Sequence, residues 1–84
     1  MQSKHTKTLA AIFARPTQGS IRFCDVGALV KALGGDVREG SGSRVVLQIG
    51  ATVKHAHRPH PAKEAKKYQV EEIRAWLQEQ GIKP

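Results

Sequence analysis

Residues 44–58 read RVVLQIGATVKHAHR, and this stretch has the pattern of a β-hairpin. Apolar and more polar side chains alternate over residues 44–49, which is typical of a strand with one buried face. Gly50-Ala51 predicts a tight reversal, because glycine accepts the positive φ that hairpin turns need. The returning strand is expected from about Thr52 to Arg58, and the prolines that follow would end it.

The sequence on either side of this hairpin predicts one more strand and three helices. A short strand is expected at 36–39, and residues 63–67 are expected to form the start of the last helix or its approach. Apolar residues recur at helical spacing in three groups: Leu9, Ile12 and Phe13; Val26, Leu29, Val30 and Leu33; and Val70, Ile73 and Leu77. The order α-α-β-β-β-α predicts one α+β domain over residues 1–84, with helices packed on one face of a three-stranded antiparallel sheet.

The charge of the chain indicates a polyanionic partner. Lysine and arginine number 14 against 7 acidic residues, which gives a formal net charge of +7. Nucleic acid, an acidic protein or an anionic membrane surface would each fit such a charge. A membrane is the least favoured of these, because no stretch approaches the roughly 20 apolar residues of a spanning helix.

Two further features predict a cytoplasmic protein. No apolar segment like that of a signal peptide follows the amino-terminal residues. The lone cysteine, Cys24, fits a reducing compartment, because it has no internal disulfide partner. Cys24 lies among apolar residues, so we expect a buried side chain rather than a reactive thiol.

Basic residues gather around the predicted hairpin and the start of the last helix. They are Arg38, Arg44, Lys54, Arg58, Lys63, Lys66 and Lys67. Such cations hold phosphates without reading bases, and the small residues Gly42 and Ser43 would let a phosphodiester approach the backbone. Tyr68 and Trp76 are too few and too far apart for a base-stacking platform, which favours recognition of helical RNA by its backbone. The alternative interpretation is a solvated charge run.

Three histidines, His55, His57 and His60, fall within six residues. Imidazole is a common zinc ligand, so a metal site is one interpretation of this cluster. The neighbouring cations Lys54 and Arg58 would repel a metal ion, and no acidic residue or cysteine follows at a usual ligand spacing. We therefore expect no metal and no small-molecule cofactor, with the histidines facing phosphate or solvent.

Three segments resemble the HicA (YcfA-like) family of toxins from bacterial type II toxin–antitoxin systems. The residues 26–35 resemble the family's leading helix, His60-Pro61-Ala62-Lys63-Glu64 its second motif, and Gln80-Gly81-Ile82 the end of its closing helix. The resemblance covers roughly residues 21–82, and residues 1–16 look like an added helix. It implies a fold similar to a double-stranded-RNA-binding domain, metal-independent mRNA cleavage, and neutralisation by a HicB-type antitoxin.

One position departs from the family pattern. The catalytic histidine of the family follows Gly-Ser, and Arg44 stands at that position here. Arginine stays protonated, so it would stabilise charge on a phosphate but would not act as a general base. His57 or His60 would then have to supply the base. The sequence leaves two versions open: an mRNA endoribonuclease, or an RNA-binding module without nuclease activity.

A third hypothesis makes the chain a protein-interaction subunit whose positive surface docks an acidic partner. Leu9, Ile12 and Phe13 of the added helix would then supply an interface or extend the core.

Overall fold

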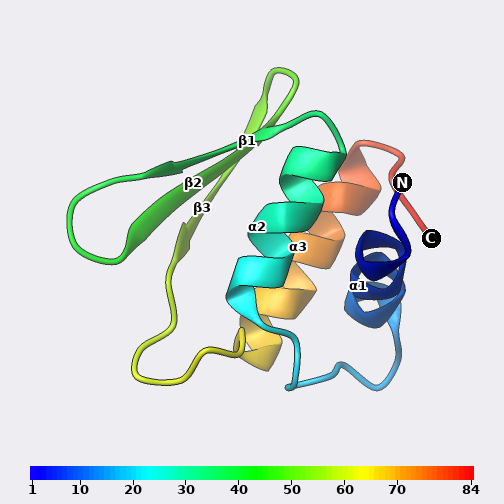
Figure 1. The fold of residues 1–84 in the computed structure, drawn as a ribbon, viewed down its shortest axis with the longest axis horizontal. Coiled ribbons are helices and arrows are strands. Elements are labelled where there is room, and N and C mark those ends of the chain that lie inside the picture. Colours follow the sequence, from blue (N-terminus) through cyan, green and yellow to red (C-terminus); the bar gives the residue numbers. More distant parts are fainter.

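The computed structural model describes residues 1–84 as three helices and one three-stranded sheet (Figure 1). Its elements are α1 (Ser3–Phe13), α2 (Phe23–Ala32), β1 (Asp36–Glu39), β2 (Arg44–Ile49), β3 (Thr52–His57) and α3 (Lys67–Glu79). This order confirms the α+β fold and the α-α-β-β-β-α sequence of elements. No helix of the chain combines the length and the apolar character that a membrane span requires.

The sheet has the order β1-β2-β3, and both strand pairs are antiparallel. Ile49 pairs with Thr52, so the reversal falls at Gly50-Ala51 as predicted, and Gly50 has a φ of +59°. Val45 and Leu47 on the central strand are 1% and 0% exposed, because they lie against the helices. The helices gather on this one side and leave the opposite face of the sheet uncovered (Figure 1).

The first helix belongs to the hydrophobic core. Leu9 and Ile12 are 5% and 0% exposed and pack with residues of α2, β2 and α3. Arg74 of α3, itself buried, donates through Nε to the Ile12 carbonyl oxygen at 2.8 Å and through Nη2 to that of Ala14 at 3.2 Å. The apolar side of the added helix is therefore used in the core. Both ends of the chain lie on the helical side of the molecule, away from the sheet (Figure 1).

The structure decides one local alternative and corrects one expectation. Residues 63–66 form the approach to α3, which begins at Lys67, because the segment before the helix pairs with the approach to α2. The Phe23 N–H donates to the Lys63 carbonyl at 2.9 Å, and the Ala65 N–H donates to that of Ile21 at 2.7 Å. Cys24 is exposed instead of buried, because it lies on the side of α2 opposite its buried apolar stripe.

Candidate nucleic-acid interface

The face of the sheet that the helices leave uncovered carries mostly polar and basic side chains. Because Val45 and Leu47 point toward the helices, the residues that alternate with them point the other way. This open sheet face consists of Arg38, Arg44, Val46, Gln48, Val53, His55 and His57. Asp36 is the one carboxylate that the same alternation places there, so two arginines leave the face net positive.

Arg44 and His57 are direct cross-strand partners on this face. Directly opposed residues of an antiparallel pair have Cβ atoms roughly 4.5–5.5 Å apart, so one phosphate can contact both side chains. Both side chains are exposed, and both line an open hollow of about 380 Å³ together with His55. Arg38 lies in the next row, and its Nη2 donates to Gln48 Oε1 at 2.6 Å.

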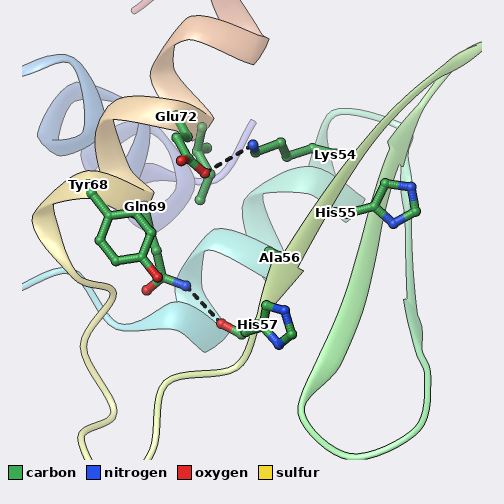
Figure 2. A pocket seen from close by; sticks show the side chains of 8 residues that line it. Lys54, His55, Ala56, His57, Tyr68, Gln69 and Glu72 are labelled. Atoms are coloured by element: carbon green, nitrogen blue, oxygen red, sulfur yellow. Dashed lines mark hydrogen bonds and ion pairs between the residues drawn. The ribbon is translucent and has the colours of Figure 1, made fainter.

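His57 is held at the end of β3 by contacts on two sides. Its carbonyl oxygen accepts a 2.8 Å hydrogen bond from Gln69 Nε2 of α3, and its ring Nδ1 lies 3.4 Å from Ser43 Oγ. Figure 2 shows the rings of His55 and His57 directed away from α3, whereas the Lys54 side chain reaches toward it. The backbone of His57 is thus fixed, and its imidazole is exposed beside Ser43 Oγ.

A second hollow joins the end of β3 to the start of α3. It measures about 220 Å³, and Ser43, His57, His60 and Lys66 are among the residues that line it. The segment that carries His60 is tied at one end by the Arg58 N–H, which donates to the Ser43 carbonyl oxygen at 2.7 Å, and at the other by the Ala65–Ile21 hydrogen bond. Two histidines and a lysine therefore surround one hollow beside the open sheet face.

Three of the basic residues expected to bind RNA, Lys54, Arg58 and Lys67, lie away from the open sheet face. Lys54 Nζ is 3.0 Å from Glu72 Oε1, and Figure 2 shows this ion pair between β3 and α3. Arg58 Nη2 is 3.0 Å from Glu39 Oε1, on the helix-facing side of the sheet. The stem of Lys67 lies against Gly19, since a Cβ built on that glycine would be 3.5 Å from Lys67 Cε. The basic residues that gather around the predicted hairpin and helix start are therefore divided among different places in the structure.

The turn before β2 has an open backbone at Gly42. Gly42 has a φ of +62°, and no atom lies within 4 Å of where its Cβ would be. Ser43 and Arg44 follow directly, so the turn places the Arg44 side chain at the border of the open sheet face. The structure does not bring His55, His57 and His60 together as a group of three potential metal ligands.

Two residues that sequence reasoning did not assign to the site, Gln69 and Tyr68, lie beside it. Gln69 follows Lys66 by three residues, the spacing of a helix-capping glutamine, and its Oε1 does accept from the Lys66 N–H at 2.9 Å. Its second bond, to the His57 carbonyl, has no local sequence signal. Tyr68 is 56% exposed and lines the hollow of about 220 Å³ at the end of β3. It also lines a smaller hollow between β3 and α3, which His57 and Glu72 border as well.

Comparison of the chain with family models, curated proteins and solved structures finds no match.

Proposed function

We propose that this chain is a HicA-like toxin-family protein that binds RNA through its open sheet face and the hollow at the end of β3. The observation that carries the proposal is the cross-strand pair of Arg44 and His57 on the helix-free side of the sheet. A guanidinium presents several donors to phosphate oxygens, and an imidazole beside it can accept or release a proton near neutral pH. The α+β order and the HicA-like motifs support the same assignment.

The arrangement also supports a cleavage mechanism without a metal. A base takes the proton of a ribose 2′-hydroxyl, the 2′ oxygen attacks the adjacent phosphorus, and the bond to the next nucleotide's 5′ oxygen breaks. His57 is the proposed base, and His60 the acid that gives a proton to the departing 5′ oxygen, since both line one hollow. Arg44 stabilises the negative charge that develops on the phosphate.

The proposed biological setting is that of a cytoplasmic type II toxin, with mRNA as the target and a HicB-type antitoxin as the protein partner. The support for this setting is the resemblance in residues 21–82 together with the charge of +7. The competing hypothesis, a module that binds RNA without cutting it, shares the same surface and differs only in turnover.

The decisive experiment incubates the purified full-length protein with labelled mRNA, with and without a chelator. Cleavage that survives chelation and falls by about 10²–10⁴-fold in His57→Ala supports the nuclease. His5→Ala, on α1, is the matched control and should cleave like the wild type. RNA retained without cleavage supports the binding module. No RNA affinity at low salt contradicts the proposal and favours the protein-interaction subunit.

A further inference from the structure

Arg58 and Lys63 border a groove that adjoins the hollow at the end of β3, because Arg58, Pro59 and His60 line both. Two adjoining hollows of about 290 and 300 Å³ share Phe23, Cys24 and Arg58 in their lining. The first runs between the outer side of α2 and β1, and the second continues past Lys63 along the segment after β3. Together they form one groove, here called the α2–β1 groove.

The wall that α2 contributes to this groove is made of small side chains. Cys24, Gly27 and Ala28 follow one another at helical spacing on the exposed side of the helix, opposite its buried stripe. Across the groove lies Val37 of β1, whose Cγ2 would be 3.7 Å from a Cβ on Gly27. Small side chains of α2 and the packed Val37 side chain therefore line this part of the groove.

The charged groups around the groove are mostly positive. Lys31 lines one end, Lys63 lines the other, and Arg58 lies between them over the Phe23 ring at 5.7 Å. The one carboxylate in the lining, Glu39, is already bound to Arg58. Three cations against one carboxylate leave a net charge of +2, and Lys31 and Lys63 have no carboxylate partner.

The edge of the sheet borders the same groove. β1 pairs only with β2, so its other side presents main-chain groups to solvent. The Gly40 N–H donates to the Arg44 carbonyl, and the alternation of an antiparallel pair then turns the amides and carbonyls of Val37 and Glu39 outward. An extended chain laid along β1 would find these groups free and in strand register.

We propose that the α2–β1 groove binds an extended, acidic segment of a partner protein, which adds a strand to the edge of the sheet at β1. Main-chain hydrogen bonds to Val37 and Glu39 supply affinity, as in other strand-addition complexes. Alternate apolar side chains of the partner pack on Ala28 and Val37, and its carboxylates pair with Lys31 and Lys63. A nucleic acid fits this surface less well, since its backbone offers no matching donor pattern to a strand edge.

A display selection tests this proposal directly. Short random peptides are selected on the full-length protein, and the most enriched peptide is synthesised and titrated into isotope-labelled protein by NMR. We expect enrichment of sequences with apolar residues at every second position and acidic residues toward both ends, so that both kinds of side chain face the groove. We also expect chemical-shift changes at Gly27, Ala28, Val37 and Glu39, with slowed amide exchange at Val37 and Glu39.

Charge reversals then decide between a specific groove and general attraction to a basic protein. Lys31→Glu and Lys63→Glu should each weaken peptide binding by about tenfold. Lys7→Glu changes the net charge equally but lies exposed on α1, away from the groove, and should bind nearly as the wild type. Thermal melts confirm that each variant is folded.

The proposal is overturned by any of three results: no enriched peptide, shifts confined to the open sheet face around His55 and His57, or equal weakening in all three variants. RNA affinity is measured separately on the same proteins, so failure of this proposal and failure of the RNA-binding proposal are distinguished.

Discussion

The Gln69 side chain joins the start of α3 to the end of β3, because its Nε2 donates to the His57 carbonyl oxygen at 2.8 Å. Its Oε1 at the same time accepts from the Lys66 N–H at 2.9 Å, and the side chain is only 6% exposed. One buried amide therefore sets the position of the histidine proposed as the base relative to the helix that carries Lys66.

Replacing this amide should loosen the site and destabilise the fold. We expect Gln69→Leu to lower the free energy of unfolding by about 1–3 kcal/mol, because two backbone groups lose their partner. The measurement is urea denaturation followed by circular dichroism. Gln78→Leu, an exposed glutamine of the same helix, is the control and should change stability by less than about 0.5 kcal/mol. Equal stability of the two variants would refute the role given to Gln69.

Arg74 should be the main attachment of α1 to the rest of the molecule. Besides the carbonyls of Ile12 and Ala14, its Nη2 donates to Thr17 Oγ1 at 3.0 Å. We expect Arg74→Met to cost about 3 kcal/mol, since it leaves buried carbonyls without a charged donor. Hydrogen exchange should accelerate in α1 first. Arg15→Met, an exposed arginine close to the same helix end, is the control, and an equally small effect of both would contradict this account.

Arg44 and Lys54 are both cations of the hairpin, but they should behave differently toward RNA. We expect Arg44→Ala to weaken RNA binding and to reduce the slope of log affinity against log salt by about one. Lys54 is bound to Glu72 and directed toward α3, so Lys54→Ala should leave the slope nearly unchanged. Titrations at several salt concentrations measure both variants. A larger loss in Lys54→Ala would place the RNA elsewhere on the molecule.

A histidine at position 44 separates the two versions of the proposal. Arg44→His places a second imidazole directly opposite His57, at the position of the catalytic histidine in the HicA pattern. If the chain binds RNA without a working base, we expect RNA cleavage to increase by about 10² or more, the usual contribution of a positioned base, and growth to slow when the variant is expressed; if His57 is already the base, we expect no gain, because Arg44 is lost from the phosphate. Arg38→His, in the neighbouring row of the same face, is the control. Where the wild type does not cleave, RNA binding without any gain in the variant would show that the scaffold does not position a base there.

Much of the fold could be predicted from local patterns. The alternation from Arg44 to Ile49 and the glycine at position 50 suffice for the hairpin and its register, because a two-residue reversal leaves no freedom in the pairing. The apolar neighbours of Cys24 in the sequence predict a buried side chain, which is wrong. Helical spacing puts Cys24 on the side of α2 opposite the buried residues Val26 and Leu29, and this spacing correctly indicates an exposed side chain.

The candidate site was harder to predict, because its cations are sorted by partners far away in the sequence. Strand alternation already separates Lys54 and Arg58 from His55 and His57, since neighbouring residues of a strand face opposite sides. That Lys54 meets Glu72 and Arg58 meets Glu39 depends on how α3 and β1 pack beside β3. No local pattern contains this information, so a set of seven basic residues looked like one surface.

The location of both chain ends on the helical side has a practical use. An affinity tag or a fluorescent protein fused at either end would project behind α1, so the uncovered side of the sheet stays accessible to large molecules (Figure 1). When the protein is immobilised on a sensor chip by either end, that side is oriented toward the flowing solution.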